Sequence, residues 1–438
     1  MLNTDDNDYF YNRIVIRPTD RPKALEPKFT SHRLLKGAYD TIFTYFNNLR
    51  SQVGKGFSTA LLEWRRYLLN GARVLVLKVP DSTLAFVMFE TLNDRGIKTS
   101  QVDLVKNHLF EQAGKRIGEV QRSWSAMRGM IESIGADDDL LMEYMRWACC
   151  VMYGITREKE VFDQIVKNSR GPVNAIRLVA ALDQMASDYA ALFNPEHPKW
   201  NAYPAGMRDT VRTLMGLEVK QMRPLLLSVA KNFTPQRAFA AFNRLVSWAV
   251  RMTIAGGSKA GRLDTFYANL AHDVNSGKIK DYATLLATTK GAIPSDAEFK
   301  VYFQTLRVKV SRTARYYLRS LEKTVEGAKE PAWIPNEDAT VVNLEHIMPQ
   351  TVCSEWGVTE QDVETHTHRL GNLALLQASQ NVIAARCPFL EKKPILEKAP
   401  YRLTQMIAKF DKWGVAQIEQ RQAKLAEDAP RTWPIHAK

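Results

Sequence analysis

The sequence predicts a mainly helical protein with a short β-segment near its N-terminus and a C-terminal module of two strands flanked by helices. Apolar residues between 116 and 325 recur at helical spacing, which predicts a large helical body. The branched apolar run Gly71–Val79 is typical of a strand. After the proline-containing segment Gly327–Glu337 the pattern changes to two short apolar runs, which predicts a separate C-terminal module.

The same patterns predict the order of the elements and three domains. The polar opening, to about residue 30, is interrupted by prolines and predicts an irregular arm. Further elements are expected as helices over 31–69, Ser82–Leu92 and Ser100–Gln112, a turn at Asn93–Gly96, and helix breaks at 135–139, 194–204 and 256–261. We therefore predict an N-terminal domain over 1–115, a helical domain over 116–328 and a site-bearing domain over 329–438.

Charge is distributed unevenly along the chain. The net charge is +13, but residues 331–438 hold 12 Lys/Arg against 13 Asp/Glu. The remaining 48 basic and 34 acidic residues give residues 1–330 a net charge of +14. A basic region of this kind favours an anionic partner such as DNA. We therefore expect the residues outside the C-terminal module to supply most of the electrostatic attraction to that partner.

Other classes of protein do not fit the composition. No apolar run approaches the length of a membrane span, and the acidic start MLNTDDNDYF is unlike a signal peptide, so we expect a cytoplasmic protein with no membrane contact. Four scattered cysteines exclude a disulfide framework, and the absence of a CxxC pair argues against structural zinc.

Basic residues also mark candidate DNA contacts. A long helix is predicted over Val301–Lys323, and five of its basic residues fall on one face at i+3 and i+4 spacing. These are Lys309, Arg312, Arg315, Arg319 and Lys323. This pattern is typical of a solvated helix face and, to about the same degree, of a helix that contacts DNA phosphates. Lys392 and Lys393 form a second candidate pair.

Four side chains in the last hundred residues have the chemistry of phosphodiester hydrolysis. A branched strand ends at Glu345–His346, a polar loop follows over Gln350–Arg369, and Asn381 follows Asn372 by nine residues. Glu345 and Asn381 offer oxygen ligands to a hard cation such as Mg²⁺ or Mn²⁺. His346 can activate water, and Asn372 can brace the loop and fix the His346 imidazole in one tautomer.

This segment resembles the ββα-metal (HNH) nuclease finger, through Glu345-His346-Ile347-x-Pro349, Asn372-Leu373-x-x-Leu376 and Asn381. The resemblance implies that His346 is the general base, that Glu345 and Asn381 bind the metal, and that Asn372 is structural. Glu345 stands where Asp is commoner, and the paired cysteines of many such fingers are absent. The alternatives to these functional roles are structural ones: an incidental histidine at a strand end, a turn asparagine at 372 and a helix N-cap at 381.

The whole block resembles the C-terminal nuclease domain of GmrSD-like modification-dependent restriction endonucleases. The matching features are EHIMPQ, HRLGNLALL, Lys392-Lys393, Trp413, Arg421 and Trp433-Pro434, and FETLNDRGIKTSQVDLVKNHLF resembles the end of the family's partner domain. The resemblance implies a metal-dependent DNA endonuclease of an antiviral restriction system that acts on modified foreign DNA.

One departure from that family keeps a second function open. The Asp-Gly-Gln-Gln-Arg motif of the partner domain does not occur. The resemblance therefore implies that residues 1–115 are a truncated C-terminal part of that DGQQR-type domain, and no nucleotide site is expected in this chain. The alternative is therefore a non-cleaving DNA-binding or regulatory subunit that needs a DGQQR-bearing partner domain, or a homo-oligomer, to act. His366 and His368 lie in the loop and are expected to be solvated, with His368 the better candidate for a contact.

Overall fold

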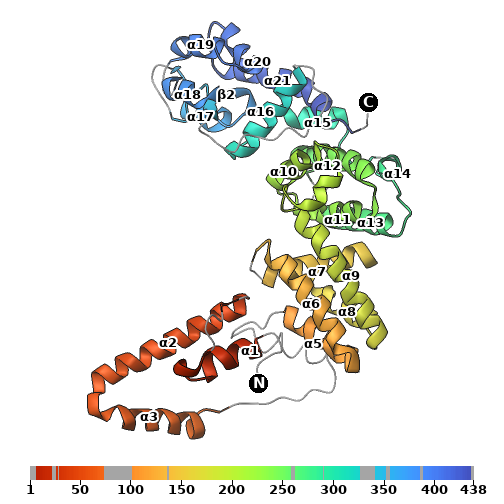
Figure 1. Cartoon of the computed structure of the whole chain (residues 1–438). Helices are drawn as coiled ribbons and strands as arrows, with labels where there is room; N and C mark the ends of the chain where they lie inside the picture. Colours follow the sequence, from red (N-terminus) through yellow and green to blue (C-terminus); the bar gives the residue numbers. More distant parts are fainter. Residues whose placement is uncertain are drawn as a thin grey trace. The chain divides into compact units, whose positions relative to one another are not determined.

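The computed structural model describes ten stretches of the chain, which are 6–21, 26–27, 29–73, 101–135, 138–257, 262–289, 291–325, 341–351, 356–384 and 388–435. The chain divides into two compact units, Met1–Gly96 and Ile97–Lys438. The described part is mainly helical, as predicted (Figure 1). Among the helices described, none combines the length and apolar character that crossing a bilayer requires.

The first unit is built from helices whose apolar residues are largely exposed. It contains α1 (Asn7–Phe10), α2 (Thr30–Val53) and α3 (Phe57–Arg66), with Gly54 at positive φ ending α2. The predicted N-terminal β-segment is not among the described strands. Gly71 instead closes a helical turn that begins at Tyr67, and residues 74–79 lie outside the described residues. The same is true of the expected helix and turn over 82–96.

The helical body begins the second unit, with helix ends near each of the three predicted breaks and further breaks that were not predicted. Its helices are α5 (Gln101–Ala113), α6 (Ile117–Glu132), α7 (Asp138–Tyr153), α8 (Val161–Asn168), α9 (Pro172–Ala191), α10 (Met207–Leu217), α11 (Arg223–Asn232), α12 (Pro235–Ala255), α13 (Leu263–Asn275) and α14 (Tyr282–Thr288). Proline at the first turn starts α9 and α12, where its missing N–H costs no hydrogen bond. Cys149 and Cys150 are buried thiols in α7.

The predicted helix over Val301–Lys323 is wrong. The chain instead forms α15 (Asp296–Phe303), an extended segment, and α16 (Ser311–Val325). The extended segment pairs with the chain ahead of the second strand: Arg307 bridges to Arg369, and the Val308 N–H donates to the His368 carbonyl at 2.7 Å. Tertiary pairing therefore overrides a helical pattern that no glycine or proline interrupts.

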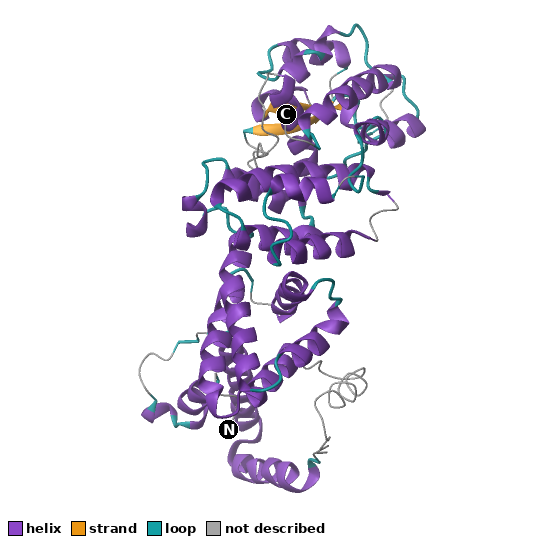
Figure 2. Cartoon of the chain, turned by 90° about the vertical axis from the view of Figure 1, so that its right-hand side faces the viewer, coloured by secondary structure: helices purple, strands orange, loops and turns teal. Residues whose placement is uncertain are grey.

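The C-terminal region holds the two strands that the structure describes. Its elements are β1 (Val342–His346), α17 (Glu360–His366), β2 (Leu373–Gln377), α18 (Ala378–Ala384), α19 (Phe389–Glu397), α20 (Arg402–Gln405) and α21 (Val415–Thr432). The strands are antiparallel, with Glu345 opposite Ala374 and His346 opposite Leu373. Figure 2 shows this two-stranded sheet surrounded by helices. The following helix, α18, packs on both strands, so the chain order here is strand, strand, helix.

The predicted polar loop between the strands contains an unpredicted helix, α17. A capping box starts it: the Asp362 N–H donates to Thr359 Oγ1, and the Thr359 N–H donates to the Asp362 carboxylate. The sequence TEQD carries this signal, since a Thr followed three residues later by an acid is typical of a helix N-terminus.

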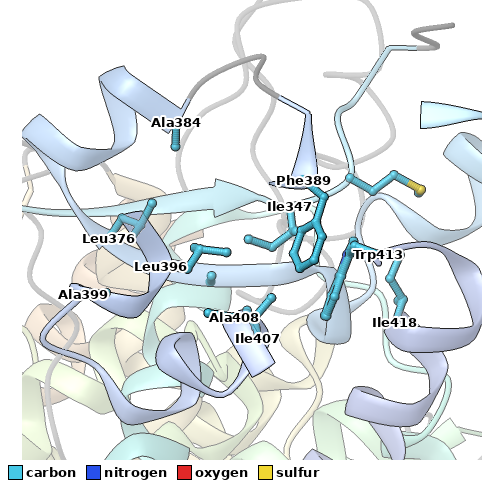
Figure 3. Packing of buried hydrophobic residues seen from close by; sticks show 12 residues of the cluster. Ile347, Leu376, Ala384, Phe389, Leu396, Ala399, Ile407, Ala408, Trp413 and Ile418 are labelled. Atoms are coloured by element: carbon cyan, nitrogen blue, oxygen red, sulfur yellow. The ribbon is translucent and has the colours of Figure 1, made fainter. Parts of the chain in front are cut away.

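Two apolar clusters fix the position of the strands. One lies between the sheet and α18–α19 and includes Ile347, Leu376 and Leu396, with the rings of Phe389 and Trp413 stacked 5.7 Å apart (Figure 3). The other surrounds the fully buried Trp433, whose ring contacts Phe299, Phe303, Tyr316 and Tyr317. Because α15 and α16 supply these four rings, they pack with elements that follow the expected boundary near residue 329.

Candidate nuclease site

Glu345 lies at the end of β1 with its carboxylate buried. In the antiparallel pair it shares a face with Ala374, so it points into the side of the sheet that α18 and α19 cover. The Lys392 ammonium, fully buried on α19, donates to Glu345 Oε1 at 2.5 Å. Burial raises the pKa of Glu345 above its usual value, and the Lys392 charge opposes that shift.

Lys392 also fixes the chain as it leaves β1. Its ammonium donates to the carbonyls of His346 at 3.1 Å and Ile347 at 3.2 Å, and it lies 5.7 Å from the centre of the Trp356 ring. All three donor hydrogens of the ammonium therefore have an acceptor. The structure thus gives Lys392 an internal role, since a buried and fully bonded ammonium is not placed to meet a DNA phosphate.

His346 is the last residue of β1 and its ring is half-buried. The Gln350 side-chain amide lies 3.1 Å from Nδ1, and the His368 ring centre lies 5.6 Å away, edge to face. Burial, and then the neighbouring His368 and Lys392, lowers the pKa of His346 to about 4. A neutral imidazole can accept a proton, which is the property that a general base needs.

Asn372 is fully buried in the turn before β2, and its amide makes all four of its hydrogen bonds. Its Oδ1 accepts from the Met348 N–H at 2.8 Å and Trp413 Nε1 at 3.1 Å, and its Nδ2 donates to the carbonyls of Met348 at 3.0 Å and Thr367 at 3.1 Å. It braces the loop after β1, as expected. The expected contact with the imidazole of His346 is absent, because no hydrogen-bonding capacity is left for it.

Two residues of α21, Arg421 and Gln422, hold the backbone of this turn by hydrogen bonds. The fully buried Arg421 donates to the carbonyls of Leu370, Gly371 and Leu373, and burial lowers its pKa to about 10. Gln422 accepts from the Gly371 N–H. A side chain at 371 would have its Cβ 2.4 Å from the Ile418 carbonyl, so only glycine allows α21 to lie this close.

Asn381 lies in the middle of α18, not at its N-cap. Asn381 as a whole is partly exposed, but its Oδ1 atom is buried and accepts no hydrogen bond from any described residue. Buried polar atoms nearly always have partners, so an orphaned carbonyl oxygen on a helix packed against β1 needs an explanation.

A divalent cation would supply that explanation. Its preferred ligands are oxygens, and the orphaned Oδ1 of Asn381 and the Glu345 oxygen that Lys392 does not hold are both oxygen donors. Among the described residues, no group of three or more His, Cys, Asp or Glu side chains is gathered as for a metal ion. Glu345 and Asn381 are therefore the described residues that could offer oxygen ligands to such an ion.

The five predicted DNA contacts around α16 separate into two groups. Lys309 is exposed on the extended segment before the helix. Arg312 lies against Gly216 of α10, Arg315 is buried, and Arg319 and Lys323 are half-buried. Burial lowers the pKa of Arg319, which also lies near Arg315. These five basic residues are therefore largely covered by the elements that pack on α16, and Lys309 is the one most exposed to solvent.

Three other residues near the site differ from their sequence interpretation. Lys393 is half-buried, and its ammonium is 3.9 Å from Asp411. His366 is buried in α17 rather than solvated, with Thr365 Oγ1 2.7 Å from its Nδ1. His368 does contact His346, and burial, Lys309 and Arg307 lower its pKa.

Sequence reasoning gave no roles to Gln350, Trp413 and Arg421, which contact the site residues or the Asn372 turn. It also gave none to Arg307, which pairs with Arg369 nearby. Trp413 and Arg421 belong to the motif that carried the family resemblance, which was a signal for them. Gln350 follows His346 by four residues in EHIMPQ. No local pattern pointed to Arg307, because its place depends on a pairing with residues more than sixty positions away.

Part of the chain matches a known protein family. Residues 293–428 match the family model of GmrSD restriction endonucleases, C-terminal domain. The matched segment contains α15, α16, both strands and α18–α20. No curated protein gives a significant match to the chain. This segment is therefore similar to a restriction endonuclease domain, which supports a nuclease and points to DNA as its substrate.

Proposed function

We propose that the C-terminal region hydrolyses DNA phosphodiester bonds in an HNH-type reaction that requires a divalent metal. The observation that carries the proposal is the arrangement at the end of β1. The neutral His346 follows the buried Glu345 at the strand end, and the helix after β2 carries the unpaired oxygen of Asn381. The similarity of residues 293–428 to a restriction endonuclease domain supports it.

The residues of this chain would act in distinct ways. His346 would take a proton from the attacking water, and Glu345 and Asn381 would hold Mg²⁺ or Mn²⁺. When bound, the cation would stabilise the charge on the scissile phosphate and the leaving oxygen. Asn372 would act indirectly, by fixing the Met348 backbone and hence the end of β1.

The biological setting belongs to the same proposal. A restriction endonuclease with this site would act in the cytoplasm against foreign DNA, and the family resemblance points to modified phage DNA. The basic residues outside the C-terminal module would supply most of the attraction to DNA. A DGQQR-bearing partner or a second copy of the chain would control the activity.

The Glu345–Lys392 ion pair favours one alternative, a DNA-binding subunit that does not cut. In that case the carboxylate would serve only to hold Lys392. The two proposals differ in whether Mn²⁺ or Mg²⁺ produces strand breaks in DNA that the chain binds.

Cleavage of supercoiled plasmid DNA, modified and unmodified, tests the proposal. With Mn²⁺ or Mg²⁺ the wild-type chain should nick or cut, and His346→Ala should lose at least about 10²-fold in rate. His197→Ala, a histidine of the helical body, is the matched control and should cut as wild type does. Equal cutting by His346→Ala would overturn the assignment, and binding without any cutting would favour the alternative.

A further inference from the structure

A short basic segment lies beside the histidine pair and has no role in the site described so far. It runs over Leu306–Lys309 and is called here the basic segment. Its Val308 N–H donates to the His368 carbonyl at 2.7 Å, and its Leu306 carbonyl accepts from the Leu370 N–H at 3.4 Å. The basic segment thus pairs with residues 368–370 through an isolated antiparallel bridge, just ahead of the Asn372 turn.

Alternation along the extended backbone decides which side chains of the basic segment reach solvent. Val308 is buried, with 7% of its surface exposed, and Arg307 and Lys309 on either side of it are exposed. Both cations are close enough to His368 to oppose its protonation. The His368 ring in turn lies 5.6 Å from that of His346, so positive charge borders the ring that would act on the substrate.

The backbone makes this arrangement rigid. Arg307 donates through one guanidinium nitrogen, Nη2, to the Glu364 carbonyl at 2.5 Å. On the paired segment, Arg369 donates to the Gln304 carbonyl at 2.8 Å. These two arginines link the basic segment to the residues around 364–370 from both sides. A guanidinium held in this way loses little conformational freedom when it binds an anion.

We propose that Arg307, Lys309 and His368 form a binding site for one phosphate group of the DNA strand on which His346 acts. The inference rests on the proposed function, and it names the residues that position the substrate. An exposed arginine and lysine two residues apart on one extended segment suit a single phosphate diester. The arginines of α16 are less suited to this role, because packing buries Arg315 and partly covers Arg312 and Arg319.

Binding in the absence of metal tests the site separately from cleavage. The probe is a fluorescein-labelled DNA duplex in EDTA, titrated with the full chain at several salt concentrations. The double variant Arg307→Gln/Lys309→Gln should bind about tenfold more weakly, and its salt dependence (log Kd against log salt) should flatten by about one unit. Lys309→Arg should keep wild-type binding, because it keeps the charge.

A matched charge control separates a site from a general field. Arg237→Gln/Lys280→Gln removes two exposed cations of the helical body and changes the net charge equally. The control should lose clearly less affinity and less salt dependence than the basic-segment variant, and thermal unfolding should show both double variants folded. An equal loss in the two double variants, or wild-type binding by the basic-segment variant, would overturn the proposal.

A neutral phosphate in the substrate locates the contact. Once the cut is mapped, a methylphosphonate placed at each phosphate around it in turn should slow cleavage by wild type at one position. At that position the basic-segment variant should show no added loss, because the contact is already gone. Additive losses at every position would contradict the site. Failure of cleavage with an intact binding difference would count against the proposed function and not against this site.

Discussion

Two asparagines nine residues apart are treated in opposite ways by the fold. Asn372, in the turn before β2, is fully buried and satisfies all four hydrogen-bonding positions of its amide. Asn381, on the helix after β2, has a buried oxygen with no partner among the described residues. The same side chain is therefore part of the scaffold at one position and available to a ligand at the other.

The difference shows how hydrogen-bond satisfaction separates the two roles. A fully bonded buried amide stabilises the fold and has nothing left to offer a substrate or metal. An orphaned buried oxygen costs stability unless something binds it. Substitutions at fully bonded buried groups should therefore lower the free energy of unfolding most, and a substitution at the unpaired oxygen should lower it least.

The largest effect is expected from Asn372→Ala. The substitution leaves the Met348 backbone, the Thr367 carbonyl and the Trp413 indole N–H without their partners. The free energy of unfolding should fall by about 4 kcal/mol. Urea unfolding followed by tryptophan fluorescence measures the loss, and a loss under 1 kcal/mol would break the contrast.

Lys392→Met should rank next, with a loss of about 3 kcal/mol, because it leaves the buried Glu345 carboxylate without its counter-ion. The double variant Glu345→Gln/Lys392→Met should recover part of this loss. Lys393→Met is the matched control next in sequence, and its half-buried, longer ion pair with Asp411 should contribute under about 0.5 kcal/mol. Equal losses at 392 and 393 would contradict the internal role of Lys392.

Gly371→Ala should cost about 2 kcal/mol, because its Cβ would meet the Ile418 carbonyl at 2.4 Å and force α21 away from the turn. Gly118→Ala is a control with open space around the added Cβ, and it should be neutral or stabilising. Thermal unfolding of both variants measures the difference, and a Tm at 371 equal to wild type would show that the turn can shift.

Asn381→Ala should have the smallest effect on folding. Removing an oxygen that has no hydrogen bond should change the free energy of unfolding by under about 0.5 kcal/mol, and any change should favour the folded state. Metal-dependent cleavage should nonetheless fall by about 10²-fold, and Asn381→Asp, which keeps an oxygen donor, should retain activity. A large loss of stability in Asn381→Ala would place Asn381 in the scaffold with Asn372.

Local patterns predicted the elements that local chemistry determines. The strand ending at Glu345–His346, the second strand over 373–377 and the three predicted breaks in the helical body all follow from hydrophobic period and turn residues. The bracing role of Asn372 also followed, because a buried polar residue next to a glycine turn has few other uses.

Non-local packing determined what the sequence pattern missed. The Val301–Lys323 helix is broken by pairing with 368–370, and α16 is covered on the face that its arginines occupy. Lys392 was expected at the surface beside Lys393, but its partner Glu345 is 47 residues away in sequence. Neither a periodicity nor a charge count contains such contacts.

The central claim is that the unpaired oxygen of Asn381 and the carboxylate of Glu345 bind one divalent cation. Mn²⁺ binding to the full chain, followed by electron paramagnetic resonance of the free ion, tests it directly and without DNA. Wild type should show a saturable Mn²⁺ site. The affinity should fall strongly in Asn381→Ala and be kept in Asn381→Asp, with all three proteins equally stable. Wild-type Mn²⁺ affinity in a folded Asn381→Ala protein would contradict it.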